Sequence, residues 1–87
     1  MKNYDLHLEV IAPETVVFEG IVQLVQVPGE EGQFTILQHH APVVARLANG
    51  GIRVVDEGGK EEVIACEGGF LECRDNSVTI LLDRVAK

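Results

Sequence analysis

Glycine pairs interrupt the second half of the chain at short intervals, and apolar residues alternate with polar ones between them. The pairs are Gly50-Gly51, Gly58-Gly59 and Gly68-Gly69, and Pro28-Gly29 ends an earlier apolar run. Turn residues at this spacing divide a chain into short strands. No segment shows apolar residues at helical spacing over three turns. The sequence therefore predicts an all-β fold, with one domain over residues 1–87 and nine or ten short strands packed as a sandwich or barrel.

The N-terminal segment shows the alternation clearly. Leu6, Leu8 and Val10 fall on one face of an extended chain, and His7 and Glu9 fall on the other. Successive side chains of a β-strand point to opposite faces, so this pattern predicts an opening strand with one buried side.

The clearest hairpin signal lies near the C-terminal end, at Asp75-Asn76. With these two residues as the turn, Cys73 faces Val78 and Leu71 faces Ile80 across one side of the ribbon. The sequence therefore predicts both the position of this hairpin and its register.

The charge of the chain excludes several classes of partner. The formal net charge is −7 and the sequence pI is about 4.7. Such a surface repels phosphate backbones and anionic lipid head groups, so no nucleic acid is expected, and a basic protein partner fits better. The same charge also serves simple solubility.

Neither membrane insertion nor a disulfide framework is expected. The first residues lack the pattern of a signal peptide, and no apolar run approaches the roughly 20 residues that span a bilayer. Cys66 and Cys73 lie among apolar residues on predicted strands. One cysteine pair in a chain of this kind is not a disulfide framework, so we expect two buried free thiols.

The most distinctive segment is PGEEGQFTILQHHAP, residues 28–42. Its glycines could suggest a phosphate loop, but no phosphate-binding motif is present and two carboxylates would repel a phosphate. His39 and His40 could be metal ligands, yet neighbours on a strand point to opposite faces, so only a sharply turned backbone would bring them together. A nucleophilic site is disfavoured because no strained turn exposes a serine, and Ser77 belongs to the hairpin turn.

The acidic tip of this segment favours a different role. Glu30 and Glu31 lie in a tight glycine-bounded turn beside Gln33. Carboxylates at such a tip can meet cationic groups of a partner without first being desolvated in a core. Such contacts would be salt-sensitive and individually weak. The acidic pairs at 56–57 and 61–62 are assigned to solvated loops.

Several blocks of the chain resemble the epsilon-subunit family of the rotary ATP synthases. The run VPGEEGQFTILQHHAPVVARLANGGIRV, residues 27–54, is similar to the family pattern PGxxGxF, then ILPxHAP, then a Leu-x-x-Gly turn. GGFLECRDNSVTILLD, residues 68–83, resembles the block that closes the family's β domain, and LHLEVIAPETVVFEG, residues 6–20, resembles its opening strand pair. The similarity covers nearly the whole chain in order.

This resemblance implies a flattened ten-stranded β-sandwich in the central stalk of an ATP synthase. It implies a subunit that binds the gamma subunit and the c ring, couples proton or sodium flow to ATP synthesis, and is not an enzyme and uses no cofactor. Such a subunit is peripheral to the membrane through the complex. The expected location is the cytoplasmic side of a bacterial inner membrane, with a plastid thylakoid membrane as the alternative.

The resemblance also assigns contact residues. The loop expected to face the c ring consists of Gly29, Glu30, Glu31, Gly32 and Gln33. The residues expected to face the gamma subunit are Ala12, His40, Ala41 and Pro42.

Two departures from the family pattern limit these expectations. Gln38 replaces the proline of ILPxHAP, which frees the backbone there. The sequence ends at Lys87, where many relatives continue into a two-helix hairpin, so no C-terminal helical domain and none of its inhibitory activity is expected. Two other functions stay open: a metal-dependent, cupin-like small β-barrel enzyme, and an unrelated β-sandwich adaptor that recognises peptide or carbohydrate.

Overall fold

The computed structural model describes residues 3–84 and contains strands but no helix in that range. The predicted all-β class is confirmed. Among these residues there is accordingly no helix with the length and hydropathy to cross a membrane. The six strands are β1 (Leu6–Ala12), β2 (Thr15–Gly29), β3 (Gly32–Leu37), β4 (Val43–Asp56), β5 (Glu61–Arg74) and β6 (Ser77–Leu82).

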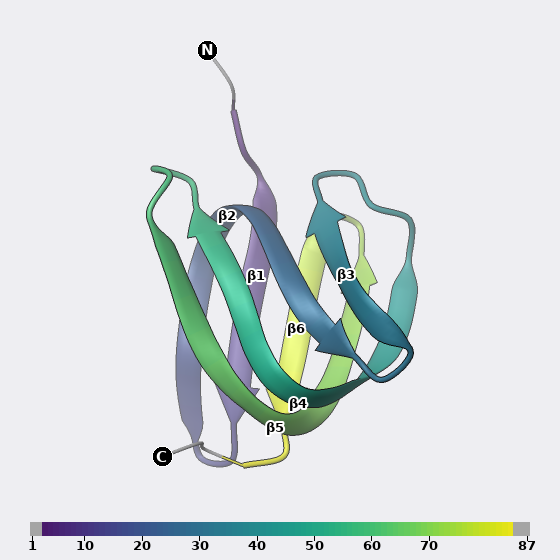
Figure 1. Ribbon diagram of the computed structural model, residues 1–87. Helices are drawn as coiled ribbons and strands as arrows, with labels where there is room; N and C mark the ends of the chain where they lie inside the picture. The colour runs from purple at the N-terminus through teal and green to yellow at the C-terminus, as the bar shows by residue number, and fades with distance from the viewer. Residues whose placement is uncertain (1–2, 85–87) are drawn as a thin grey trace.

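Five of the strands form a closed ring. The order of the sheet is β1-β6-β5-β4-β2-β3, and a further pairing between β1 and β2 closes the first five into a barrel, with β3 attached to β2 (Figure 1). The β1–β6 pair is parallel and all other pairs are antiparallel. The principal extents of 37 × 23 × 20 Å show a body elongated along one axis.

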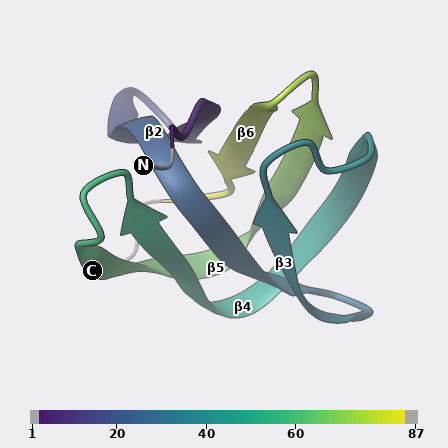
Figure 2. The ribbon, with the colours of Figure 1, turned by 90° about the horizontal axis from the view of Figure 1, so that it is seen from above.

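The barrel is flattened into two layers because its longest strands bend. Strands β2, β4 and β5 have 15, 14 and 14 residues. The first half of β2 pairs with β1 and its second half with β3 and β4. Strands β4 and β5 pair with each other throughout, but β2 lies mainly beside the second half of β4 and β6 only beside the second half of β5. One layer contains β1, β6 and the halves of β2, β4 and β5 that lie beside them. The other contains β3 and the remaining halves, so β6 and β3 lie in opposite layers (Figure 2).

The predicted number of strands is wrong for the same reason. Gly50-Gly51 and Gly68-Gly69 lie inside β4 and β5 and do not separate strands, and the β4–β5 register passes both pairs without a shift. Glycine lets a strand bend sharply while its hydrogen-bonded ladder continues. Only Gly58-Gly59 forms a turn, where the Asp56 carboxylate accepts hydrogen bonds from the backbone N–H groups of Gly58 and Lys60, each at 2.9 Å.

The local strand predictions are confirmed. Leu6, Leu8 and Val10 are fully buried, and the β5–β6 hairpin pairs Cys73 with Val78 as expected. Both cysteines are free and buried. No polar or charged side chain is buried within residues 3–84, so the core is purely apolar. Its members are Leu6, Leu8, Val10, Ala12, Val22, Val25, Val27, Ile36, Leu47, Ile52, Val54, Cys66, Leu71, Cys73, Val78, Ile80 and Leu82.

Candidate partner-binding sites

The β2–β3 hairpin requires glycine on both sides of its acidic tip. Gly29 pairs with Gly32 across the turn. A Cβ on Gly29 would lie 2.7 Å from the carbonyl oxygen of Gly32 and 2.9 Å from the ring of Phe34, which are overlaps. Gly32 has a φ of 134°, a conformation that residues with a Cβ avoid. The sequence therefore builds a turn tight enough to present Glu30 and Glu31 at its tip.

Beside this tip lies a cleft of about 630 Å³. It separates β3, at the edge of one layer, from the first half of β4, at the edge of the other. Its lining residues are Gly29, Glu30, Glu31, Gly32, Gln33, Phe34, Val43, Val44, Ala45 and Arg46.

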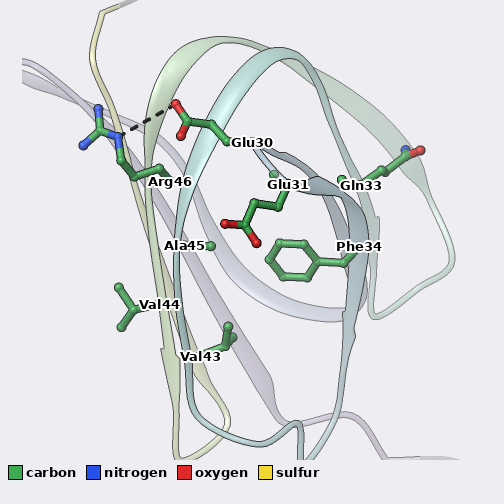
Figure 3. A pocket seen from close by; sticks show the side chains of 10 residues that line it. Glu30, Glu31, Gln33, Phe34, Val43, Val44, Ala45 and Arg46 are labelled. Atoms are coloured by element: carbon green, nitrogen blue, oxygen red, sulfur yellow. Dashed lines mark ion pairs between the residues drawn. The ribbon is translucent and has the colours of Figure 1, made fainter.

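The two glutamates have different surroundings. The Glu30 carboxylate lies 4.0 Å from Nε of Arg46, and the Glu30 N–H donates a 3.0 Å hydrogen bond to the Arg46 carbonyl. Glu31 points into the cleft toward the ring of Phe34 (Figure 3). Among residues 3–84, no basic group forms an ion pair with Glu31. The cleft thus offers a free carboxylate above an apolar floor.

Such a cleft suits a long cationic side chain. The aliphatic stem of a lysine or arginine could lie against Phe34 and Val43, and its charged head could reach the Glu31 carboxylate. An arginine could also stack on the Phe34 ring. The geometry therefore favours recognition of a basic protein loop.

All five residues assigned to the c-ring contact line this cleft. The opposite wall, Val43 to Arg46, was missed by the sequence analysis. Nothing in the local pattern indicates that the start of β4 returns to the β2–β3 turn, because this proximity depends on Gly29 pairing with Leu47 beyond a register shift. The only feature of the sequence that could have indicated this contact is the positive charge of Arg46, which is complementary to the acidic tip.

His40, Ala41 and Pro42, assigned to the gamma contact, lie together in a second, shallower hollow of about 500 Å³. The hollow is also lined by Asp5, His39, Asp75 and Asn76, so it joins the N-terminal segment, the β3–β4 loop and the β5–β6 turn. These three segments come from distant parts of the sequence.

Asn76 holds the three segments together. Its Oδ1 accepts a 2.7 Å hydrogen bond from the N–H of His39, and its Nδ2 donates a 2.9 Å hydrogen bond to Oδ1 of Asp5. The Asn76 carbonyl also accepts a 2.9 Å hydrogen bond from the N–H of His7. His39 and Asn76 both have positive φ, 62° and 61°, which asparagine tolerates better than most residues. We call this set of bonds the Asn76 latch.

The departure at Gln38 adds a further link to the same region. The Asp5 N–H donates to Gln38 Oε1, and Gln38 Nε2 donates a 3.4 Å hydrogen bond to the carbonyl of Asn3. A proline has no side-chain polar group and could form neither bond. The replacement therefore ties the β3–β4 loop to the N-terminal segment.

Ala12, the fourth residue assigned to the gamma contact, lies elsewhere. It is the last residue of β1, pairs with Thr15, and has 1% of its surface exposed. Strand β1 ends at the bottom of Figure 1, whereas the β3–β4 loop lies at the top. A partner could meet Ala12 only through the backbone and the adjacent turn, so the four residues do not form one patch.

The histidine pair lies on a turned backbone, the condition under which it could have acted as a chelating pair. His39 has left-handed φ, but within residues 3–84 no three His, Cys, Asp or Glu side chains are grouped to hold a metal ion. Nδ1 of His40 donates a 2.7 Å hydrogen bond to the Ala41 carbonyl.

Comparisons with known proteins agree with the resemblance in the sequence. The family described as "ATP synthase, Delta/Epsilon chain, beta-sandwich domain" matches residues 5–87. The ATP synthase epsilon chain of Leptospira interrogans is 47% identical over 86 residues, and that of Leptospira borgpetersenii is 45% identical. In each case the alignment spans 99% of this chain and 67% of the relative.

Two solved structures contain chains of similar fold. A chain in the cryo-EM structure of the OSCP/F1/c-ring part of Euglena gracilis mitochondrial ATP synthase superposes with a TM-score of 0.82 at 26% identity, over 93% of this chain and 53% of its own length. A chain from the central stalk and c-ring of the Tetrahymena thermophila enzyme superposes with a TM-score of 0.72 at 13% identity, over 94% of this chain and 66% of its own length. With a family match over almost its entire length and relatives above 40% identity, this chain belongs to the delta/epsilon-chain β-sandwich family of the ATP synthases.

Proposed function

We propose that this epsilon-type chain acts as a non-catalytic joint in the central stalk, where it binds the gamma subunit and the c ring and couples ion translocation to ATP synthesis. Family membership over residues 5–87 supports the rotor role. The cleft at the acidic hairpin is the observation that carries it, because its chemistry fits a basic loop. The complex would hold the chain at the membrane, on the cytoplasmic side in a bacterium.

The contact with the c ring would be made by Gly29 to Gln33. Glu31 has no ion-pair partner among the described residues and faces the cleft, so it would receive a lysine or arginine from the ring. Glu30 already lies near Arg46 and would mainly contribute to the negative potential. Both carboxylates remain near solvent, so neither is buried at high cost.

The contact with the gamma subunit would involve His40, Ala41 and Pro42. Ala41 and Pro42 are exposed, and the Asn76 latch fixes the backbone that presents them. At the other end of the molecule, the gamma subunit would meet the turn next to Ala12 and not its buried side chain. Contacts with the gamma subunit at both ends, together with the ring contact at the β2–β3 hairpin, would let one rigid body bridge the shaft and the ring.

The barrel is suited to pass torque because it has few soft connections. Pairing of β1 with both β2 and β6 closes the ring of strands, so deforming it would break hydrogen bonds along a whole ladder. An apolar core packed at interior density resists compression. We infer that stiffness is the mechanical property on which coupling depends.

Charge reversal at the acidic tip tests the proposal. The double variant Glu30→Lys, Glu31→Lys should lower the affinity for a purified, detergent-solubilised c ring carrying bound gamma subunit by about tenfold at low salt, since the Glu31 pair and the negative potential of Glu30 are lost and two repulsions appear. The measurement is a binding titration at 20 mM and at 1 M salt. At the higher salt, where the Debye length is about 3 Å, the difference should almost vanish.

Glu57→Lys is the matched control, because Glu57 is an exposed glutamate in the β4–β5 turn, outside the cleft. It should leave the affinity unchanged, and the wild-type protein should form a stable one-to-one complex with recombinant gamma subunit on size exclusion. An equal loss of affinity in the tip variant and in Glu57→Lys would contradict the assignment of the β2–β3 hairpin to the c-ring contact. Absence of any complex with the gamma subunit would overturn the proposed function itself.

A further inference from the structure

The exposed apolar side chains gather on one layer of the barrel. Within residues 3–84, five of the seven exposed large hydrophobic residues, Val16, Val17, Val44, Phe70 and Leu81, belong to the layer that contains β1 and β6. Phe70 and Leu81 point outward, because their neighbours Leu71 and Ile80 face the core. This outer face is separate from the lining of the hollow at the β3–β4 loop.

The register aligns these side chains in a row across the strands. Phe70 pairs with Leu81, Leu81 with Ile11, and Ile11 with Val16. Phe70, Leu81 and Val16 are 37%, 48% and 55% exposed, and Ile11 is half-buried. We call these four residues the apolar row. It runs perpendicular to the strands over β5, β6, β1 and β2.

A row of carboxylates runs beside it. Two residues farther along β5, β6 and β1, and three along β2 because of the bulge between Val10 and Ile11, Glu72 pairs with Thr79, Thr79 with Glu9, and Glu9 with Glu19. Glu19 lies 3.6 Å from Nε2 of His7, whereas Glu72 and Glu9 have no ion-pair partner among the described residues. We call Glu72, Glu9 and Glu19 the acidic row.

The two rows limit what can cover this face. A second copy related by a two-fold axis would bring acidic rows into one interface, and an anionic membrane would be repelled by them. Strand addition is excluded because β5, β6 and β1 are each paired on both edges. The remaining fit is an element with an apolar stripe and positive charge along one side.

We propose that an amphipathic α-helix of a partner protein docks across these strands, with aliphatic residues on the apolar row and lysines or arginines over the acidic row. The spacing supports this arrangement. Neighbouring strands lie about 4.8 Å apart and successive helical turns about 5.4 Å apart, so each turn meets the next strand. Four strands span about 14 Å, which is close to three turns. The inference goes beyond the proposed function, because it names the binding element for a face that the proposed contacts leave open.

A peptide titration followed by NMR tests it. The probe is an 18-residue, end-capped helical peptide with leucines at i, i+4, i+7 and i+11 and lysines along one flank. With the isotope-labelled protein we expect amide shift changes around Phe70, Leu81 and Ile11, and none at the Glu30–Gln33 loop. A second peptide with glutamates in place of the lysines should bind at least tenfold more weakly.

Variants of the protein give the matched comparison. Leu81→Ser and Glu72→Lys should each weaken binding of the lysine peptide about fivefold or more, and Val63→Ser should not, although Val63 is 64% exposed on the other layer. Amide spectra check that each variant is folded.

Three results would overturn the inference: equal affinity for both peptides, shift changes outside this face, or an equal effect of Val63→Ser. None of them touches the proposed function, which fails only if the chain does not bind the gamma subunit or the ring.

Discussion

Two glycines in the strands show how a single Cβ decides whether a position tolerates change. A Cβ on Gly69 would lie 2.6 Å from the carbonyl oxygen of Leu81 and 3.3 Å from Cα of Leu82, so the backbones of β5 and β6 approach too closely for any side chain. A Cβ on Gly20 would meet only the ring of Phe18, at 3.8 Å, which is ordinary contact. Only the first glycine is required by the fold.

We therefore expect Gly69→Ala to destabilise the protein by about 1–3 kcal/mol, as overpacking against rigid backbone does. Gly20→Ala should be neutral or stabilise by up to about 1 kcal/mol, because it lowers the entropy of the unfolded chain. Urea unfolding followed by circular dichroism measures both. Equal effects of the two substitutions would show that the contact with Leu81 does not limit position 69.

The glycine pairs also show which local features could be predicted from the sequence and which could not. Turn residues in the pattern were identified correctly at Gly58-Gly59 and Asp75-Asn76. The same dipeptide at Gly68-Gly69 bends a strand instead of ending it, because its neighbours continue the ladder on both sides. A turn and a bend need the same backbone freedom, so composition alone does not separate them.

At the scale of elements, the Asn76 latch connects parts that are adjacent only in the folded protein. The turn of the β5–β6 hairpin was predicted, but its bonds to Asp5 and His39 were not, since they join residues separated by 71 and 37 positions. The glycines and the glutamate pair of the β2–β3 hairpin were likewise visible in the sequence. The wall opposite them, at Arg46, depends on pairing between distant strands.

Asn76→Gly should remove the two side-chain bonds of the latch and keep the backbone bond to His7, without straining the turn, because glycine accepts the positive φ of 61°. We expect a loss of about 1–2 kcal/mol from two hydrogen bonds. The sharper readout is hydrogen exchange of the His39 amide, which loses its acceptor 2.7 Å away. The Glu30 amide, bonded to the Arg46 carbonyl at 3.0 Å, is the internal control and should not change. Unaltered protection of His39 would contradict the latch.

At the scale of the whole molecule, the alternation of apolar and polar residues predicted which side of each strand is buried. It did not predict how the strands pair into a closed barrel. The apolar sides of β1 and β6 were both predicted, yet their parallel pairing joins the two ends of the chain and has no local signal. Closure encloses one continuous core that includes both cysteines. We infer that the barrel unfolds as a single unit.

The two thiols can test that cooperativity. Cys66 and Cys73 are 2% and 1% exposed, and Cys66 Sγ donates a 3.4 Å hydrogen bond to the carbonyl of Ala48. Burial raises the pKa of both thiols above the ordinary value. A reagent such as iodoacetamide needs the thiolate, so it should reach and modify either residue only after the barrel opens.

If opening is global, both cysteines should be alkylated at one rate, and the logarithm of that rate should rise with urea at the slope of equilibrium unfolding for both. The direction in which folding stability changes with pH follows from the raised pKa of the two thiols. The unfolded thiols ionise first, near pH 8.5, so the unfolded state holds fewer protons and stability falls as pH rises from there toward the raised folded pKa. Peptide mass spectrometry of pulse-alkylated samples at pH 7 and 9 resolves the two sites. Faster, urea-independent labelling of Cys73 alone would mean that the β5–β6 hairpin opens by itself, and the barrel would then not be the single stiff unit that the proposed transmission of torque requires.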